Sequence, residues 1–496
     1  MKPVKFYDAL INNTVEHPER NNATSQRLFE VMENVLPGKQ AEDFTNHLKK
    51  KLGNPHPHSA LTSQQANIII DEFDQFNVKT EDLTEIIDQL FLCELSTQEI
   101  LQLHRTYKIP VSKLETDILP VQGNGCWIRD SKGDWFLDLD SNYSASNLGM
   151  ANLEIAKGLY HQAKTLISMK EDRIQVARAR FLKEISQMMP RGLTNFYWQN
   201  SGGEAVDKAL KIAKAYTQTK QVVAFRHGFH GRTHGAVAVT HNLKYRKPFL
   251  LDQEDWVHFA DFNDLESVKR VLDETGSKII IMEMVQGEEA GNLPADQGFI
   301  NQLWDFAREN NIIIIDDEVQ AGFGRTARKR GDWFACMSYE VVPDIMVIGK
   351  SFGGGYPVTA VVTSSNISEQ MKPGYDGSTF GGNPMAMVSA LIATRQMRRK
   401  NITENVIERS TQIEQGFSAL QNKYDLVKDF RVYGLMIALD LGNEQQVKIM
   451  QEKLRDNGVK SSLSTGKYIR FLPPTIISAG EVDYFLNTLD EVIGNL

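Results

Sequence analysis

The chain has 496 residues, of which 24% are charged, and its formal net charge at pH 7 is -8. An acidic chain without a long block of Lys and Arg is not expected to bind nucleic acid or an anionic membrane surface. Its length suits one large domain with one or two smaller units.

The chain also lacks the features of a secreted or membrane protein. No stretch approaches the roughly 18 apolar residues of a transmembrane helix, and the first residues have no apolar signal core. Its three cysteines, Cys93, Cys126 and Cys336, are scattered and form no CxxC motif. This usage is typical of a reducing compartment, so we expect a cytoplasmic protein.

Residues 1–118 predict a helical extension. Apolar residues recur at helical spacing within residues 28–36 and again within residues 83–91. Ser96 and Glu99 form a possible capping box for a further short helix that would end near residue 109.

The next part of the chain changes to short strands and then to a regular alternation. Strands are predicted between Gly123 and Asp138, followed by a helix-rich stretch. Strand patterns then alternate with helical segments, which predicts an α/β fold with a large, mostly parallel sheet covered by helices on both faces. The predicted strands are residues 195–199, 221–225, 278–283, 311–316, 344–348 and 358–363.

A helix over residues 385–398 is followed by a mixture of helices and strands, with strands predicted at 435–439 and 468–472. This mixture is typical of a small α/β domain. The predicted organisation is therefore a helical extension, the N-terminal part of a small domain, a large domain and a C-terminal small domain, at residues 1–118, 119–165, 166–400 and 401–496.

Lys350 and the acidic run at Asp316 and Asp317 predict the chemistry. Lys350 follows an apolar strand and precedes the glycines of Gly353–Gly355, which allow a flat ligand to approach the backbone. Asp317 stands at the end of the buried strand 311–316, where open α/β sheets bind ligands. An amine and an anion so placed favour pyridoxal 5'-phosphate, because the lysine can hold its aldehyde as a Schiff base and the carboxylate can keep its ring nitrogen protonated.

Metal binding is not predicted. His56 and His58 lie in a segment rich in Pro and Gly, without companion ligands at a useful spacing. His227, His230 and His234 are accompanied by no Glu or Cys at the spacing of known zinc motifs.

Five motifs together resemble a known family. They are Asn200–Ala205 (NSGGEA), Phe229–Thr233 (FHGRT), Asp317–Thr326 (DEVQAGFGRT), Lys350, and Gly377–Pro384 (GSTFGGNP). From about residue 119 to the end, the chain resembles the class III, or ω-amino acid, aminotransferases of fold type I. That family contains ornithine, acetylornithine, 4-aminobutyrate and putrescine aminotransferases.

The resemblance implies a set of cofactor-binding residues. Ser201, Gly202 and Gly203 would offer backbone N–H groups at a helix N-terminus to the phosphate. Phe229 would stack on the pyridine ring, with His230 beside it in the same motif. The remaining roles are Asp317 at the ring nitrogen, Gln320 at the 3-hydroxyl, Lys350 at the aldehyde and Thr379 at the phosphate of the neighbouring subunit. Asp316, which points to the opposite face of the strand, is the weaker candidate for the ring nitrogen.

The resemblance also implies substrate contacts. Arg470 would bind the α-carboxylate of glutamate or 2-oxoglutarate, and Glu288 would neutralise Arg470 when an ω-amino donor is bound. Arg232 would bind the distal carboxylate of the donor, and Tyr143 its polar groups. Several residues depart from the family pattern in segments that shape the pocket rim, so the identity of the donor stays open. These departures are Gly203, Met284, Met150–Leu153 and Ala327–Arg330.

The expected protein is thus a homodimer with shared active sites that moves an amino group from an ω-amino donor to a keto acid, with 2-oxoglutarate as the expected acceptor. One alternative is an enzyme of the same fold without an acceptor, such as an aminomutase, racemase or decarboxylase. Another is an inactive, partner-binding homologue. Arg470 and Glu288 favour transfer over the first, and the presence of Lys350, Asp317 and Gln320 disfavours the second.

Overall fold

The chain divides into two compact units, Met1–Leu119 and Pro120–Leu496. Each unit is described below by itself. The computed structural model describes residues 25–36, 38–52, 65, 68, 69, 72, 73, 76, 86, 97–112, 114–464 and 466–496.

In the described part of the first unit, the helices are α2 (Ser25–Val35), α3 (Gly38–Lys51) and α6 (Thr97–Tyr107). The helix predicted within residues 28–36 is confirmed as α2. It shares an apolar core with α3, built around the fully buried side chains of Leu28 and Phe44. The predicted cap at Ser96 and the loop with His56 and His58 lie outside the described residues, as does most of the helical pattern at 83–91.

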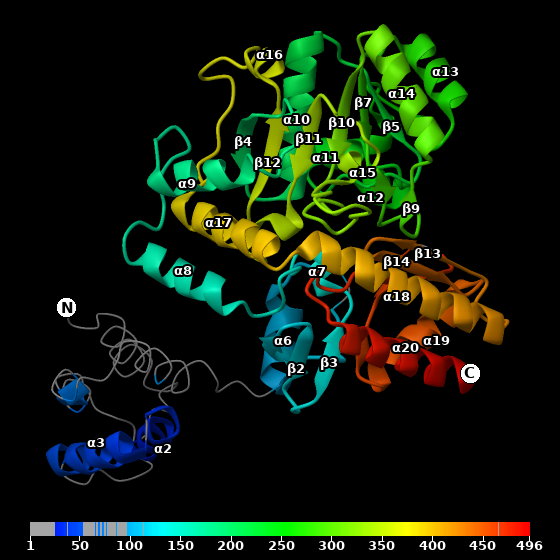
Figure 1. Ribbon diagram of the computed structural model, residues 1–496. Coiled ribbons are helices and arrows are strands. Elements are labelled where there is room, and N and C mark those ends of the chain that lie inside the picture. The colour runs from blue at the N-terminus through cyan, green and yellow to red at the C-terminus, as the bar shows by residue number, and fades with distance from the viewer. Residues whose placement is uncertain are drawn as a thin grey trace. The chain divides into compact units, whose positions relative to one another are not determined.

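The second unit is built around a seven-stranded sheet in the order β4-β12-β11-β10-β7-β5-β6 (Figure 1). All six strands predicted for this sheet are confirmed, and β6 is an additional strand at its edge. The neighbours from β11 through β6 run parallel, whereas β12 is antiparallel to both β11 and β4. The strands are β4 (Asn195–Gln199), β5 (Val222–Phe225), β6 (Val257–Ala260), β7 (Ile279–Met282), β10 (Ile313–Asp317), β11 (Ile345–Ile348) and β12 (Thr359–Thr363).

Alternate side chains of these strands enter two different apolar cores, one on each face of the sheet. On β5, for example, Val222 and Ala224 belong to one core, and Val223 and Phe225 to the other. The first core contains α10 (Gly202–Thr217) and α11 (His234–Ala238). The second contains α9 (Val176–Ile185), α13 (Leu265–Thr275), α14 (Gln297–Glu309) and α17 (Pro384–Arg399). Burial on both faces explains why these strands are almost continuously apolar.

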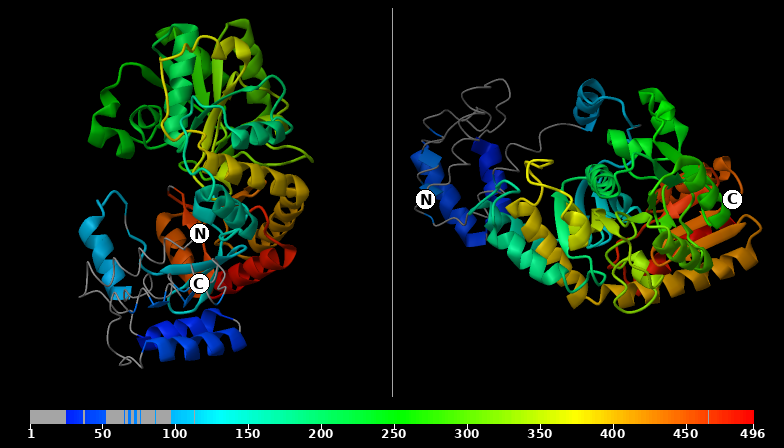
Figure 2. Two further views of the ribbon diagram at one scale, coloured as in Figure 1. Left: turned by 90° about the vertical axis from the view of Figure 1, so that its left-hand side faces the viewer. Right: turned by 90° about the horizontal axis from the view of Figure 1, so that it is seen from above.

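A C-terminal part follows α17. Its sheet has the order β13-β14-β17-β16, and α18, α19 and α20 pack against one another or against its strands. Figure 2 shows α17 and α18 following one another from the large sheet towards this part. The elements are α18 (Ile402–Lys423), β13 (Asp429–Tyr433), β14 (Met436–Asp440), α19 (Glu444–Asp456), β16 (Ser462–Leu463), β17 (Tyr468–Phe471) and α20 (Ala479–Gly494).

A third sheet joins distant parts of the chain, because β15 near the C-terminus pairs in parallel with β3. Its strands are β1 (Pro120–Asn124), β2 (Trp127–Asp130), β3 (Trp135–Asp138) and β15 (Val459–Lys460). The remaining elements are α7 (Ser141–Ser144), α8 (Leu153–Ala163), α12 (Leu243–Arg246), η3 (Lys247–Phe249), η4 (Leu251–Gln253), β8 (Val285–Gln286), β9 (Leu293–Pro294), α15 (Ala335–Ser338), η5 (Lys350–Gly353) and α16 (Ser365–Ser368).

None of the helices in the described part of the chain combines the length and the apolarity that a membrane crossing requires.

Candidate active site

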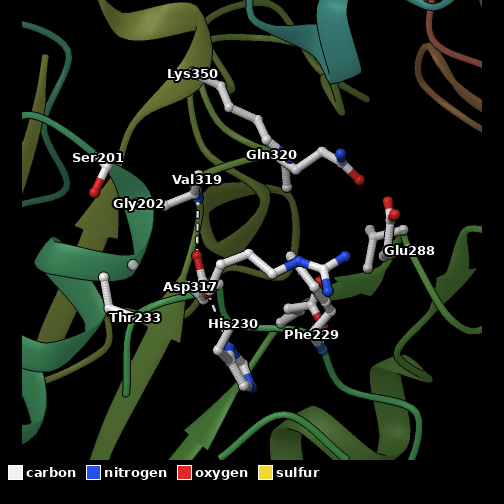
Figure 3. A pocket seen from close by; sticks show the side chains of 16 residues that line it. Ser201, Gly202, Phe229, His230, Thr233, Glu288, Asp317, Val319, Gln320 and Lys350 are labelled. Carbon is white, nitrogen blue, oxygen red and sulfur yellow. Dashed lines mark hydrogen bonds and ion pairs between the residues drawn. The ribbon is translucent and has the colours of Figure 1, made fainter. Parts of the chain in front are cut away.

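Three neighbouring parallel strands bring their carboxyl ends to one edge of the large sheet. Asp317 ends β10, Glu283 directly follows β7, and Lys350 follows β11 after one glycine. Parallel strands place such ends side by side, and open α/β sheets bind ligands there. The topology alone therefore gathers two carboxylates and an amine. Figure 3 shows Asp317 and Lys350 among the side chains that line the pocket.

These side chains line one cavity of about 270 Å3. That volume lies just below the range for small-molecule sites, about 300–1,000 Å3, and suits a small ligand. The lining residues are Ser201, Gly202, Gly203, Phe229, His230, Gly231, Arg232, Thr233, Glu283, Val285, Glu288, Asp317, Val319, Gln320, Ala321 and Lys350. The structure thus brings together every predicted cofactor residue except Thr379.

Lys350 has an unusual backbone conformation and a perturbed amine. Its φ of 45° lies in the left-handed region, which costs a non-glycine residue on the order of 1–2 kcal/mol. Next to it, the Ser351 hydroxyl donates to the Ser144 carbonyl at 2.9 Å and helps to hold this turn. Withdrawal from water lowers the pKa of the Lys350 amine to about 8. About a tenth of the amine is therefore uncharged at pH 7, far more than for an ordinary lysine, and available as a nucleophile.

Asp317 is held by two hydrogen bonds, which Figure 3 marks with dashed lines. One carboxylate oxygen lies 2.9 Å from Nδ1 of His230, and the other accepts from the Val319 N–H at 3.2 Å. Burial alone would lower the pKa of His230, but the hydrogen bond and charge of Asp317, together with Glu283, raise it. The contact with His230 fixes the orientation of the Asp317 carboxylate.

Asp316 faces the other side of β10. It is fully buried beside Glu318 and Cys336, and ligand atoms of the three side chains all lie within 4.8 Å of one another. Burial and the neighbouring Glu318 raise the pKa of Asp316 well above its usual value. Asp316 is absent from the cavity wall, as expected for the neighbour of Asp317 on a strand.

Glu283 is a cavity residue that the sequence did not single out. One of its carboxylate oxygens accepts from the Phe229 N–H at 2.9 Å. Burial raises the pKa of Glu283 to about 7, with Asp317 adding to the shift and His230 opposing it. Its position directly after a buried parallel strand could have identified it from the sequence, because the same criterion identified Asp317.

The N-terminus of α10 faces the cavity. Ser201 caps it in a capping box with Glu204, whose carboxylate accepts from the Ser201 N–H at 2.8 Å. The Ser201 N–H and hydroxyl are therefore engaged within the chain, which leaves the first-turn N–H groups of Gly202 and Gly203 as the anion donors. A side chain at Gly203 would collide with Thr233, since an added Cβ would lie 2.9 Å from the Thr233 hydroxyl oxygen.

Three further predicted residues lie on the cavity wall. Phe229 is half-buried, and Gln320 donates from its amide to the Tyr143 carbonyl at 3.4 Å. Arg232 is exposed, with its guanidinium carbon 3.8 Å from the centre of the Tyr245 ring. The cavity therefore offers one aromatic face, one amide and one cation besides the groups at the strand ends.

Arg470 lies on β17, behind Glu288. Its side chain is fully buried, and Nη1 donates to the Glu288 carboxylate at 2.7 Å and to the Gly287 carbonyl at 3.2 Å. Its Nη2 has no hydrogen-bond partner. Arg470 lowers the pKa of Glu288 against the opposing effect of burial. The two side chains thus form an ion pair. Of the two, only Glu288 lines the cavity.

Besides Arg470, two predicted residues do not line the cavity, namely Tyr143 and Thr379. The Tyr143 ring lies 5.7 Å from the Arg470 guanidinium carbon, within a turn whose four residues, Ser141–Ser144, all have positive φ. Thr379 is exposed on the surface of this single chain. Tyr143 therefore lies beside the site without lining its cavity, and Thr379 does not line the cavity either.

Comparison with known proteins gives the family. Residues 109–493 match the family described as Aminotransferase class-III. An acetylornithine aminotransferase from Archaeoglobus fulgidus is 34% identical over 393 residues, covering 79% of this chain and 97% of that protein. A LysW-aminoadipate semialdehyde/glutamate semialdehyde transaminase from Sulfolobus acidocaldarius is 35% identical over 379 residues, covering 75% and 93%.

A solved structure supports the fold. The ornithine aminotransferase from Toxoplasma gondii superimposes with a TM-score of 0.75 at 23% identity, covering 82% of this chain and 96% of that one. This likeness, together with the family match, confirms the fold type predicted from the sequence. The chain belongs to the class III aminotransferases and is a pyridoxal-phosphate-dependent transaminase.

Proposed function

We propose that this transaminase moves the terminal amino group of an ω-amino donor to 2-oxoglutarate by a ping-pong mechanism. The donor would be of the ornithine, acetylornithine or diamine kind. The main support is the 2.7 Å ion pair between Arg470 and Glu288 beside a cavity that also contains Lys350. The relatives, which include acetylornithine aminotransferases, agree with such a donor.

The side chains that line the cavity are of the kinds that bind pyridoxal phosphate. Lys350 would hold the aldehyde, Asp317 the ring nitrogen and Gln320 the 3-hydroxyl, while Phe229 would cover one face of the ring. The N–H groups at the start of α10 would bind the phosphate. When bound, pyridoxal phosphate withdraws electrons from the carbon that carries the amino group.

Lys350 would also carry a proton from the substrate carbon and return one to the substrate. Its pKa of about 8 is close to neutral, so the freed amine can both accept a proton from the substrate carbon and return one. His230 supports this chemistry through Asp317, since their 2.9 Å contact orients the carboxylate towards the cavity.

Arg470 and Glu288 would serve the two half reactions in turn. With an ω-amino donor, Glu288 neutralises Arg470, so no substrate carboxylate is needed beside it. With 2-oxoglutarate, Glu288 would move away and the α-carboxylate would take its place, using Nη1 together with the unpartnered Nη2. Arg232 would hold the distal carboxylate of either substrate that has one, and Tyr143 would contact the polar groups of the donor.

The functional unit would be a homodimer with two shared sites. Thr379 is exposed on its own chain and lies outside the cavity wall, as a residue that serves the neighbouring subunit's site must be. In this arrangement its hydroxyl would donate to the phosphate bound by the partner subunit.

A reducing compartment such as the cytoplasm is the proposed location. Cys126 and Cys336, the cysteines in the described part of the chain, are both buried free thiols. Buried thiols without a disulfide are usual where the compartment keeps them reduced.

The test is a donor panel assayed with 2-oxoglutarate, with formation of glutamate as the readout. We expect ornithine, acetylornithine or a diamine to support turnover well above α-amino acids that lack a terminal amine. Loss of donor consumption on omission of the keto acid would distinguish transfer from an acceptor-free reaction. Donor consumption that continues at full rate without any keto acid would contradict the proposal.

A further inference from the structure

The segment that carries Thr379 connects α16 to α17, and Figure 1 draws it in yellow between them. The structure describes residues 369–383 throughout, and they form neither helix nor strand. Thr379 is exposed, and so are its neighbours Tyr375 at 64% and Phe380 at 59%. Large apolar side chains exposed on both sides of one hydroxyl are typical of a surface that a partner covers. Such a segment holds the hydroxyl in one place only if other contacts fix its backbone.

Asp376 anchors the start of this segment on α10. Its carboxylate forms two ion pairs, with one oxygen 2.5 Å from Nζ of Lys208 and the other 2.6 Å from Nζ of Lys211. The Asp376 side chain is only 10% exposed, so salt and water screen these pairs less than they screen pairs on the open surface. The first oxygen also accepts from the Gly377 N–H at 2.8 Å, which ties the carboxylate to the backbone that leads to Thr379.

Helical spacing places the two lysines for this contact. Lys208 and Lys211 are three residues apart on α10, so their side chains leave the same face of the helix. Like charges at this spacing repel each other, and the Asp376 carboxylate between them offsets that repulsion. Lys208 also lies against the ring of Tyr197 on β4, with Nζ 5.8 Å from the ring centre. Asp376 is thus held by side chains that the large sheet and its helix position.

The other end of the segment is anchored as well. The Gly382 carbonyl accepts from the Arg178 guanidinium at 3.1 Å. The next residue, Asn383, caps α17 with its side chain. Thr379 therefore lies midway between two fixed points, Asp376 and Gly382, and its backbone is held although its side chain is exposed.

We propose that Asp376, Lys208 and Lys211 are positioning residues, a latch that holds Thr379 ready for the phosphate bound by the partner subunit. This inference rests on the proposed function, which places the Thr379 hydroxyl at that phosphate. The first turn of α10 carries the N–H groups assigned to the phosphate of its own chain, and the same helix carries the two lysines of the latch. One helix would then support both phosphate sites of the dimer. Because the latch orders the segment beforehand, cofactor binding does not have to do so.

The experiment measures the dissociation constant of pyridoxal phosphate for the full-length holoenzyme, by equilibrium dialysis with cofactor absorbance as the readout. Without the latch, the segment must be ordered when the cofactor binds, so we expect Asp376→Asn to raise this constant about 3- to 10-fold. The constant for enzyme reloaded with pyridoxal, which has no phosphate, should stay within about twofold of wild type. Asp255→Asn, which breaks a 2.6 Å ion pair with Lys220 on the exposed surface, is the matched control and should change neither constant.

A double-mutant cycle separates positioning from a general structural effect. In a Thr379→Ala background there is no hydroxyl left to position, so Asp376→Asn should raise the constant little further. An ion cluster that merely stabilised the fold would give the same factor in both backgrounds. Lys208→Met combined with Lys211→Met removes the latch from its other side. This variant should reproduce the effect of Asp376→Asn, and it decides the question if Asp376→Asn does not fold.

The outcomes are distinguishable. An unchanged constant in Thr379→Ala would show that the hydroxyl does not serve a phosphate, and it would overturn the shared-site arrangement together with this inference. A raised constant in Thr379→Ala, with an unchanged one in the variants of Asp376 and the two lysines, would overturn this inference alone. Equal losses for pyridoxal phosphate and pyridoxal, or an Asp376→Asn effect that persists without the Thr379 hydroxyl, would overturn it as well.

Discussion

Two adjacent aspartates show how individual residues acquire opposite roles. Asp316 and Asp317 differ by one position on β10, so their side chains leave opposite faces of the sheet. Asp317 lines the cavity and contacts His230, whereas Asp316 is buried against Glu318 and Cys336. The strand period alone predicted this difference, because the ligand edge and the apolar core lie on different sides.

The aspartates provide a matched pair of variants. Asp317→Asn keeps the shape but removes the anion, and we expect kcat to fall by at least about 100-fold, or ~2.7 kcal/mol at ~1.4 kcal/mol per tenfold. Asp316→Asn should retain kcat within about threefold, since that side chain does not reach the cavity. Steady-state kinetics on folded variants with a saturating cofactor test both. A loss below tenfold in Asp317→Asn would show that another group serves the ring nitrogen.

Glu288 and Arg470 lead to a second residue-level prediction. Glu288→Ala leaves Arg470 without its counter-charge, so α-amino donors such as glutamate should improve relative to ω-amino donors. Arg470→Lys keeps a charge but loses the planar fork, and 2-oxoglutarate binding should weaken by ~1–3 kcal/mol. Separate measurement of each half reaction is the check. Equal losses in both half reactions for both variants would remove the support for a switch between substrates.

Secondary-structure elements were predictable where local pattern and tertiary context agree. The strands of the large sheet are apolar runs because both faces are buried, and six of them were found from that pattern alone. The seventh, β6, is only four residues long, includes His258 and was missed. The turn at Ser141–Ser144 could not be predicted, because four consecutive non-glycine residues with φ from 44° to 70° oppose local preference.

Tertiary hydrogen bonds explain that turn and part of the site. The Ser141 hydroxyl donates to the Leu472 carbonyl at 2.6 Å, and the Ser144 carbonyl accepts from Ser351. These partners are far away in sequence, so no local sequence pattern predicts the contacts. By contrast, Lys350, Asp317 and the glycines of α10 were predicted because each belongs to a short motif at a strand end or helix start.

The buried acidic pair on β10 makes a prediction about stability. Burial raises the pKa of Glu318 to about 7, and the pKa of Asp316 is raised well above its usual value. Folding therefore favours the protonated forms, so the pair's contribution to stability is greatest below the carboxyl pKa of the unfolded chain, about 4, and declines as pH rises through 7. Asp316→Asn should gain stability relative to wild type as the pH rises from 5 to 8, because the variant has no carboxyl to ionise at that position.

Thermal unfolding at several pH values tests this pair. The quantity to follow is the Tm of Asp316→Asn minus that of wild type, which should increase with pH. Asp273→Asn, a substitution at an exposed position on α13, should show no such trend. A difference that is constant or decreasing with pH would mean that the pair remains ionised in the folded protein.

For the full chain, the first question is what residues 1–118 contribute. The family match begins at residue 109, so it leaves most of this extension out. We expect the chain without residues 1–118 to stay in solution and keep its cofactor absorbance, because the remaining sheets bury their own apolar faces. Size-exclusion chromatography and absorbance spectra on the truncated protein are the measurements. Aggregation or loss of the cofactor would show that the extension completes the fold or the dimer.

The second question is whether two chains build each active site. Thr379→Ala would remove one hydrogen bond to the phosphate bound by the partner subunit, or roughly 1.5–3 kcal/mol of cofactor affinity. Lys350→Ala disables the site that contains that lysine. A heterodimer of the two variants would then contain one site with both Lys350 and the partner's Thr379, and one site with neither.

Mixing the variants under conditions of demonstrated subunit exchange should therefore restore activity. At limiting cofactor, we expect the mixture to exceed the sum of the separate variants and to approach half of the wild-type activity per heterodimer. The reason is geometric: in the proposed dimer, each intact site would need Lys350 from one chain and Thr379 from the other. A mixture of either variant with itself controls for the handling of the subunits. Strictly additive activity would place Thr379 in the site of its own chain, and the shared-site arrangement would be wrong.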